Sequence, residues 1–218
     1  MKCKITNEEI EPFMSFGKMP AANGFLEKKD FKNETFYNME VGFSKKTSLF
    51  QLNKFSNPKI IHSANYPFYT ASSEYMKTHF KKYADWVQKE YLKSNSKLIE
   101  VGSNDGTFLK NFIKTSIDYL GFEPSQTVAN QAIKNKVKTI NAFFNEENVK
   151  NLRNFLNKTD VICAANVIAH IPDLKNLIQA VNKLLSSKGV FIFEEPYLGS
   201  MFSKTSYDQI YDEHIFMF

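Results

Sequence analysis

The sequence predicts an α/β protein whose mainly parallel sheet carries helices on both faces. Strand and helix patterns alternate from residue 97 onward, and strand–helix–strand connections of this kind build parallel sheets. A glycine-containing turn follows the first of these strands, and an acidic residue follows the second. The residues before 97 do not alternate in this way, so we expect a smaller N-terminal β/α unit to precede the sheet.

The alternating region contains five short apolar runs and four amphipathic segments. The expected strands are residues 97–101, 117–122, 137–142, 160–165 and 190–194. The expected helices are residues 107–115, 125–134, 146–156 and 172–187. Ser125 is placed to cap the second helix, Pro172 fits the first turn of the fourth, and Gly189 is expected to end that helix.

The first 95 residues predict fewer regular elements. Residues 37–43 alternate as a strand, with 49–52 as a hairpin partner, and Met19–Leu26 is typical of an ordered loop. Apolar residues at spacings of three and four predict a helix over 72–92, capped by Ser72 or Ser73. We therefore expect two domains, 1–70 and 71–218. The apolar end at 215–218 has no closing turn, which favours a C-terminally truncated chain.

Composition excludes several classes of function. The chain has 218 residues, 43% hydrophobic and 23% charged, and no apolar run near the length of a membrane span. Its polar N-terminus lacks a signal peptide core, so we expect a cytoplasmic protein without membrane contact. The net charge of +5 comes from scattered lysines rather than a basic tract, which argues against nucleic acid and leaves a phosphorylated substrate open. Two cysteines build no disulfide framework.

The turn after the first strand predicts a cofactor site. Ligands of open parallel sheets bind at the carboxyl ends of the strands. Gly102 permits a tight turn there, and Gly106 permits close approach of backbone or ligand. Glu123, at the end of the second strand, is placed to accept hydrogen bonds from both hydroxyls of a ribose.

The loop chemistry favours S-adenosylmethionine (SAM) over NAD. Dinucleotide loops carry a middle glycine where the backbone meets a pyrophosphate. Here that position is Asn104, and the carboxylate of Asp105 beside it would repel phosphate. SAM instead carries a sulfonium and an amino group, which suit a polar, acidic loop.

The segment from Ile99 to Gly106 resembles the signature of sugar C-methyltransferases, which act on nucleotide-linked keto-deoxysugars. Further matches cover nearly the whole chain in the same order. They are Met19–Leu26, Asn65–Phe68 with His79, Gly121–Ser125, Phe143–Phe144, Ala165–Asp173, Glu194–Tyr197 and Gln209–His214. The resemblance implies a Rossmann-like class I methyltransferase with SAM as cofactor and a nucleotide-linked sugar as its small-molecule substrate.

The resemblance also implies roles for individual residues. Cofactor contacts are expected from Gly102, Ser103, Asn104, Asp105 and Gly106 in the loop, Glu123 at the ribose, Pro124 and Ser125 near the adenosine, Phe144 beside the adenine, and Asn166 near the methionine part. Expected catalytic groups are His170 as the base, with Tyr66, Tyr211, Glu213 and His214 around the sugar. Tyr66 and Phe144 fit a plain core role as well, and His79 is more typical of a structural histidine.

The sequence departs from the family pattern in three places. The two Cys-x-x-Cys pairs that bind zinc in the family are here reduced to Cys3, with Thr6, Ser44 and Thr47 at the other places, and His62 and His79 do not restore the spacing. Since tetrahedral zinc needs about four such ligands, we expect no structural zinc. Asp212 replaces the first histidine of the family's Tyr-His-Glu-His, which removes one acid–base group. Family members also continue into a second α/β domain.

C-methylation requires a carbon nucleophile, and proton abstraction beside a ketone supplies one. Histidine is the natural base near neutral pH, and His170 follows the fourth strand. Two alternatives remain open at this point. The chain fits an O- or N-methyltransferase of another small molecule, because fold does not fix function. It also fits a SAM-binding module with little catalysis of its own.

Overall fold

The computed structural model describes residues 1–23, 25–58 and 66–218 and divides the chain into two compact units. The first unit is discontinuous in sequence and comprises Met1–Ile61, Asn166–Leu174 and Glu194–Phe218. The second comprises His62–Ala165 and Lys175–Phe193. The first unit thus takes in part of the stretch that we assigned to a 71–218 domain. Gly24, His62 and Asn65 lie outside the described residues.

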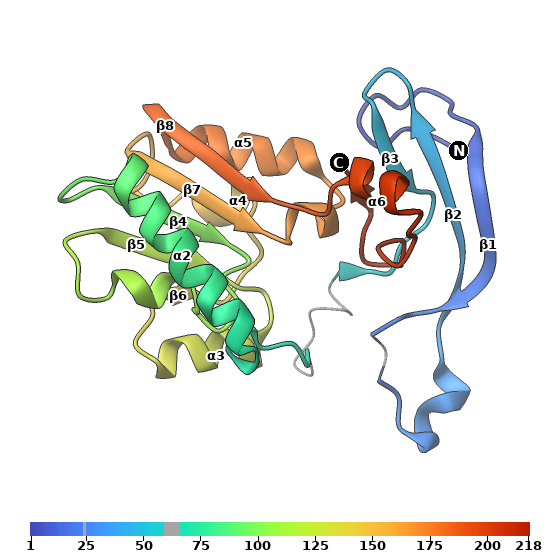
Figure 1. Ribbon diagram of the computed structural model, residues 1–218, viewed down its shortest axis with the longest axis horizontal. Helices are drawn as coiled ribbons and strands as arrows, with labels where there is room; N and C mark the ends of the chain where they lie inside the picture. The colour runs from blue at the N-terminus through green and yellow to red at the C-terminus, as the bar shows by residue number, and fades with distance from the viewer. Residues whose placement is uncertain (24, 59–65) are drawn as a thin grey trace. The chain divides into compact units, whose positions relative to one another are not determined.

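The second unit is built on a five-stranded sheet with the order β6-β5-β4-β7-β8 (Figure 1). Strand β4 pairs in parallel with both β5 and β7, and β5 pairs in parallel with β6. The predicted α/β class and parallel sheet are therefore confirmed. The strand order reverses between β4 and β7, where open sheets of this kind bind ligands. The strands are β4 (Lys97–Val101), β5 (Asp118–Phe122), β6 (Thr139–Ile140), β7 (Thr159–Ala165) and β8 (Leu185–Glu194).

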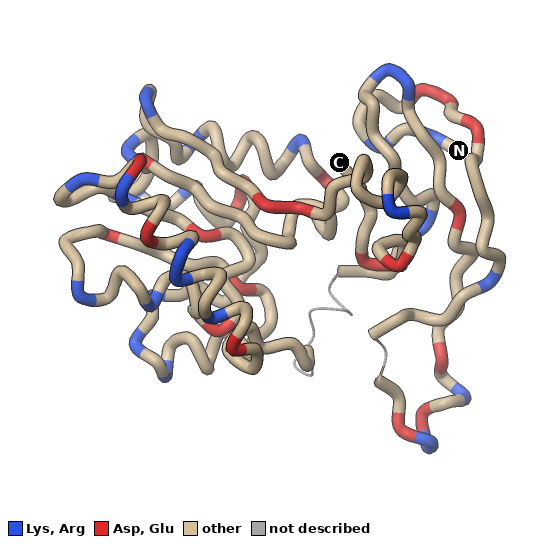
Figure 2. The backbone as a smooth tube through the Cα atoms, in the orientation of Figure 1, with Lys and Arg blue, Asp and Glu red and all other residues tan. Residues whose placement is uncertain are grey.

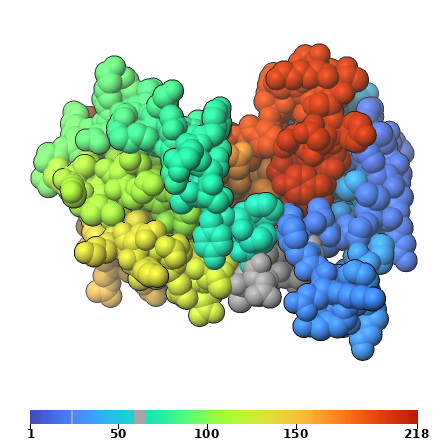
Figure 3. All heavy atoms as spheres, turned by 60° about the horizontal axis from the view of Figure 1, so that its bottom comes forward, coloured from blue at the N-terminus to red at the C-terminus, as the bar shows by residue number. Residues whose placement is uncertain are grey.

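Helix α2 (Glu74–Tyr91) lies on the surface of this unit (Figure 3) and buries one face. Its buried side chains, Phe80, Ala84 and Val87, follow the predicted spacing of three and four residues and pack in one cluster with strand residues such as Leu98. The Ser73 hydroxyl accepts a hydrogen bond from the backbone N–H of Met76 at 3.3 Å, so Ser73 is the cap. The other helical elements of this unit are η2 (Thr70–Ser72), η3 (Leu109–Phe112), α3 (Gln126–Lys134), α4 (Glu146–Val149) and α5 (Leu174–Leu184).

Two predicted helices are shorter than expected. In the expected helix 107–115, the Asn111 amide donates to the backbone carbonyls of Thr107 and Phe108, and only the 3₁₀ turn η3 forms. The expected helix 146–156 is reduced to α4, which ends at Val149.

The prediction that Gly189 ends the fourth helix is wrong. Gly189 lies inside β8. Helix α5 ends at Leu184, and β8 begins at Leu185. A Cβ on Gly189 would lie 2.6 Å from the backbone carbonyl oxygen of Thr159, so the glycine permits close approach of two backbones.

The first unit contains a four-stranded antiparallel sheet with the order β1-β2-β3-β9. The predicted hairpin is confirmed, with Ser44 opposite Leu49. The apolar C-terminal run forms β9, which pairs with β3. The sequence did not predict β1, because its side chains are nearly all exposed and two irregularities interrupt its pairing. The elements are β1 (Pro12–Pro20), η1 (Lys28–Asn33), β2 (Phe36–Ser44), β3 (Leu49–Leu52), η4 (Ile168–His170), α6 (Leu198–Lys204) and β9 (Phe216–Met217).

Charged side chains are dispersed in both units. Among the residues that the structure describes, the lysine and arginine positions and the acidic positions are spread over the elements of both units (Figure 2). Within the described part of the chain, no helix is long and apolar enough to span a membrane.

Substituting Gly106 tests the tight packing beneath β4. Gly106 has a φ of +79°, and a Cβ there would lie 2.8 Å from the buried side chain of Val137. We expect Gly106→Ala to lower the free energy of unfolding of the second unit by about 2 kcal/mol. The single tryptophan, Trp86 on α2, reports that unit by fluorescence in urea.

The double variant with Val137→Ala supplies the control. Removing the Val137 methyl groups makes room for the new Cβ, so the two losses should combine to less than their sum by about 1 kcal/mol. Strictly additive losses would show that the Val137 contact does not limit this position.

Candidate functional site

The loop from Gly102 to Gly106 is shaped by three residues in the left-handed region. Gly102, Asn104 and Gly106 have φ values of 66°, 48° and 79°. Glycine and asparagine are the residues that adopt this region at least cost. The backbone N–H of Ser103 donates to the carbonyl of Phe122 at 2.9 Å, which ties the loop to the end of β5.

Glu123 follows β5 and binds the loop through both carboxylate oxygens. Its Oε2 accepts the N–H of Asn104 at 3.0 Å, and its Oε1 accepts the N–H of Ser125 at 2.8 Å. A carboxylate has about four acceptor positions, so each oxygen retains capacity for one further donor. Burial raises the pKa of Glu123, and the charge of Asp105 adds to this effect. The two N–H bonds lower the pKa, and the net result is a pKa of about 7.

The side chains of Asn104 and Asp105 hold the segment that precedes α2. Asn104 accepts the N–H of Thr70 at 2.9 Å and donates to the carbonyl of Phe68 at 3.1 Å. Asp105 accepts the N–H of Ala71 at 2.8 Å and the Thr107 hydroxyl at 2.7 Å. These side chains therefore fix the backbone next to the loop.

Tyr66 belongs to the same segment. Its ring packs edge-to-face on Phe68, with centroids 5.5 Å apart. Because the carbonyl of Phe68 is bonded to Asn104, the predicted catalytic Tyr66 lies two residues from an anchor of the loop.

The remaining predicted cofactor residues of this unit surround Glu123. The carbonyl of Pro124 accepts the Asn141 amide at 2.9 Å, and Ser125 is fully buried at the start of α3. Phe144 is buried and packs edge-to-face on Phe122 at 5.2 Å. Of the Phe144 surface only 6% is exposed, a burial that fits its core role as well as an adenine contact.

Sequence reasoning missed Glu100 on β4. Its carboxyl group is buried, and among the described residues its Oε2 has no hydrogen-bond partner. Burial raises the pKa of Glu100 well above its usual range, and the nearby charges of Glu123 and Asp105 raise it further. Burial thus favours the neutral acid form of Glu100.

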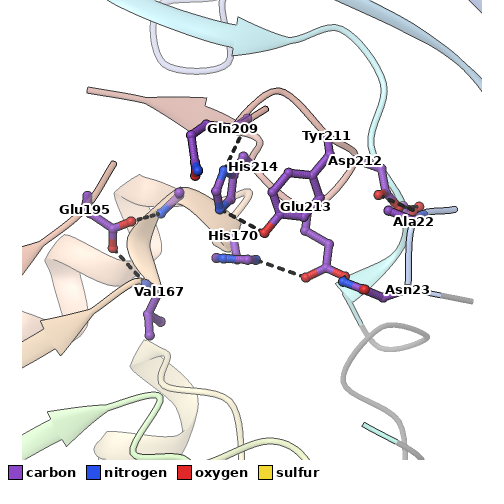
Figure 4. Close-up of polar contacts among 12 residues, drawn as sticks. Ala22, Asn23, Val167, His170, Glu195, Gln209, Tyr211, Asp212, Glu213 and His214 are labelled. Carbon is purple, nitrogen blue, oxygen red and sulfur yellow. Dashed lines mark hydrogen bonds and ion pairs between the residues drawn. The ribbon is translucent and has the colours of Figure 1, made fainter. Parts of the chain in front are cut away.

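The first unit gathers the other predicted catalytic residues (Figure 4). His214 Nδ1 lies 2.8 Å from the carbonyl oxygen of Gln209, which only accepts, so Nδ1 carries a hydrogen. His214 Nε2 lies 3.1 Å from the Tyr211 hydroxyl. Burial lowers the pKa of His214, and in the neutral ring Nε2 accepts the hydroxyl hydrogen. Burial, followed by the charge of Glu213, raises the pKa of Tyr211.

His170 faces the carboxylate of Glu213 and the ring of His214. His170 Nδ1 lies 3.6 Å from Glu213 Oε2, and the two imidazole rings are 5.0 Å apart and nearly perpendicular. Glu213 also accepts a hydrogen bond from the side-chain amide of Asn23 (Figure 4). Burial raises the pKa of Glu213, and the Asn23 bond lowers it, so Asn23 favours the ionised carboxylate.

Asp212 contacts N-terminal residues and not His170 or His214. Its carboxylate accepts the N–H of Ala22 at 3.1 Å and the Ser56 hydroxyl at 2.5 Å. After burial, the Asp212 charge is the largest cause that raises the pKa of Tyr37. The residue that departs from the family pattern thus anchors two N-terminal segments, while Tyr211, Glu213 and His214 remain with His170.

Asn166 and Glu195 shape the turn that leads to His170. Asn166 has a φ of 55°, and its N–H donates to the carbonyl of Glu194 at 2.8 Å. The Glu195 carboxylate faces the backbone of the residues that follow, Val167 to Ala169 (Figure 4).

The four positions that carry the zinc cysteines in the resembled family are here Cys3, Thr6, Ser44 and Thr47, and they lie close together. Cys3 Sγ lies 4.0 Å from the Thr47 hydroxyl, and the Ser44 hydroxyl donates to Glu8 at 2.7 Å. Burial acts to raise the pKa of the Cys3 thiol, but hydrogen bonds from Thr6 and Ser44 lower it to about 7. Among the described residues, no three His, Cys, Asp or Glu side chains are grouped to hold a metal ion.

Three residues that hydrogen-bond with the predicted catalytic residues, or with the turn that precedes His170, were not singled out from the sequence as site residues. Asn23 lies within the Met19–Leu26 match and Glu195 within the Glu194–Tyr197 match, so the resemblance marked both segments without assigning a role. Gln209 acts through its backbone carbonyl, which no residue pattern reveals.

Comparison with known families gives two matches. Residues 74–218 match the model of a methyltransferase domain, and residues 3–62 match that of a candidate zinc-binding domain. The first match covers well over half of the chain.

Individual relatives agree with these matches. The C-methyltransferase NovU of Streptomyces niveus is 27% identical over 220 residues, which cover 100% of this chain and 52% of the relative. The chain therefore spans about half the length of this curated relative.

Solved structures support the fold. The PH0226 protein of Pyrococcus horikoshii superimposes with a TM-score of 0.52 at 15% identity, over 63% of this chain and 66% of its own. A candidate SAM-dependent methyltransferase of Methanococcus maripaludis gives 0.51 at 15% identity, over 68% and 75%. The Rossmann-like methyltransferase fold is thereby established for this chain.

The tautomer of His214 is directly measurable. We expect ¹⁵N-labelled histidine spectra at neutral pH to show His214 with hydrogen on Nδ1 and a bare Nε2. Tyr211→Phe should shift the Nε2 resonance by removing its donor and leave the Nδ1–H in place. A His214 ring with hydrogen on Nε2, or one that is doubly protonated at pH 7, would contradict this assignment.

Proposed function

Because the chain belongs to the methyltransferase-domain family, we propose that it binds SAM through the Gly102–Gly106 loop and methylates a carbon of a small molecule. The substrate class that fits best is a keto-deoxysugar carried on a nucleotide. The observation that carries the cofactor assignment is Glu123, whose two oxygens are both fixed by backbone N–H groups and both keep acceptor capacity.

The residues of the loop fit SAM better than a dinucleotide. Two buried carboxyl groups, those of Asp105 and Glu123, interact electrostatically beside the loop. Such a surface disfavours a pyrophosphate and favours the positive charge of a sulfonium ligand. When bound, SAM supplies an electrophilic methyl group.

The catalytic cluster supports proton abstraction from carbon. A carboxylate 3.6 Å from His170 Nδ1 favours a proton on that nitrogen, which leaves Nε2 as the basic atom. In the proposed step, Nε2 takes a proton from the carbon beside the ketone, and the electron pair of the C–H bond forms the enolate. Glu213 stabilises the resulting imidazolium, and the Asn23 amide keeps Glu213 in place.

The other members of the cluster suit the developing oxygen charge. Burial raises the pKa of the Tyr211 hydroxyl, which therefore keeps its hydrogen at neutral pH; in the proposed step this hydrogen turns from His214 Nε2 to the developing oxyanion. An imidazole–carboxylate pair serves a hydroxyl acceptor as well as a carbon acid, so the preference for carbon over oxygen or nitrogen rests on the similarity to a C-methyltransferase.

Calorimetric titration tests the cofactor assignment. We expect SAM and S-adenosylhomocysteine to bind and NAD not to bind, and we expect Glu123→Ala to weaken both adenosyl ligands. Because the ionised Glu123 is the better ribose acceptor, affinity at pH 6 should be about tenfold lower than at pH 8.

Glu123→Gln is the matched control for this titration. The amide has no titration, so its weaker binding should be independent of pH between 6 and 8. NAD binding, or a wild-type affinity that does not change over this range, would contradict the proposed role of Glu123. Tight SAM binding without methyl transfer to any keto-sugar would favour a cofactor-binding module.

We further propose that the N-terminal unit folds without zinc. Hydroxyl side chains at positions 6, 44 and 47 do not replace thiolates as zinc ligands, and those of Ser44 and Thr47 contact protein groups instead. Purified protein should contain less than about 0.1 zinc per chain, and a chelator should leave its melting temperature unchanged.

The triple variant Thr6→Cys, Ser44→Cys and Thr47→Cys is the positive control. With Cys3 it restores four thiols at converging positions, so it should bind about one zinc per chain. Stoichiometric zinc in the wild-type protein would refute the proposal.

A further inference from the structure

The turn between β7 and His170 begins with several backbone N–H groups that its own short helix does not use. η4 is a single 3₁₀ turn, Ile168–His170, and the first N–H groups of any helix lack an intrahelical partner. Asn166 enters the turn with a φ of 55°, a conformation that costs free energy for a residue other than glycine. The turn therefore needs an interaction outside itself to persist.

Glu195 supplies that interaction with both carboxylate oxygens. Its Oε1 accepts the N–H of Val167 at 2.8 Å and of Ile168 at 2.5 Å, and its Oε2 accepts the N–H of Ala169 at 3.3 Å (Figure 4). Three consecutive N–H groups thus converge on one side chain. The next residue in the chain is His170.

The electrostatics of Glu195 connect it to the same cluster. Burial raises the pKa of Glu195, and the three N–H bonds lower it, so these bonds favour the ionised carboxylate. The charge of Glu195 also contributes to the raised pKa of Tyr211. The charge of the neighbouring Glu194 raises the pKa of Glu195 further.

We propose that Glu195 is a positioning residue that holds the Val167–Ala169 backbone and thereby sets the orientation of the His170 imidazole. The significance for catalysis rests on the proposed function, in which His170 is the base. The positioning itself does not require that function, because all of its contacts lie within the first unit of the free protein.

Nuclear magnetic resonance of the full chain without cofactor tests the positioning. In Glu195→Gln, the amide NH₂ faces at least one of the three N–H groups instead of accepting from it. We expect hydrogen exchange at Val167, Ile168 and Ala169 to accelerate by at least about tenfold. The His170 imidazole resonances should shift and broaden, while those of His79 in the second unit remain in place. The chain has four histidines, so the His170→Gln spectrum identifies the resonance.

Two further variants keep the outcome decisive. Glu27→Gln removes an exposed carboxylate of the same unit and should leave both readouts at wild-type values. Glu195→Asp keeps the charge and should restore part of the amide protection if Glu195→Gln fails to fold.

Unchanged exchange and unchanged His170 resonances in Glu195→Gln would overturn the positioning role. The same null result in both Glu195 variants would overturn it independently of any methyl-transfer assay. Conversely, the expected shifts together with an inactive wild-type chain would leave the positioning intact and refute the proposed function instead.

Discussion

One carboxylate, that of Glu123, joins three segments around the loop from Gly102 to Gly106. It lies at the end of β5, accepts the N–H of Asn104 from the loop after β4, and accepts the N–H of Ser125 where α3 begins. The loop residues with positive φ have left the β ladder, so their N–H groups need a partner elsewhere. Hydrogen bonds to a charged acceptor are worth about 1.5–3 kcal/mol each, and leaving a buried N–H without one costs a similar amount.

In the first unit, burial shifts the pKa values of several neighbouring side chains. Burial moves the pKa values of Glu213, Glu195 and Tyr211 upward and that of His214 downward, each towards the neutral form. These shifts favour a Tyr211 hydroxyl that keeps its hydrogen and a His214 ring that stays neutral. Asp212 has a structural role instead, because its carboxylate accepts hydrogen bonds from Ala22 and Ser56 and so holds two N-terminal segments.

Local patterns in the sequence were sufficient for much of the sheet and of the loop. The spacing of Phe80, Ala84 and Val87 predicts α2 because one helical face must be buried, and the alternation over 37–43 predicts β2 for the corresponding reason. Gly102, Gly106 and Glu123 were recognisable because strand ends and turn chemistry leave a local signature.

Features that depend on contacts distant in sequence were not predictable in the same way. Asn23 reaches Glu213 across 190 residues, and β9 forms only because β3 offers its edge. The position of Gly189 inside β8 depends on the carbonyl of Thr159, a neighbour that no window around the glycine contains. Two carboxylates with similar surroundings in sequence, Asp212 and Glu213, also diverge in role for this reason.

The most direct measurement is a crystal structure of the chain with S-adenosylhomocysteine. The Glu123 carboxylate should lie within hydrogen-bond distance of both ribose hydroxyls and still accept the N–H groups of Asn104 and Ser125. An adenosine bound elsewhere, or a Glu123 side chain turned away from the ribose, would contradict the central role assigned to this carboxylate.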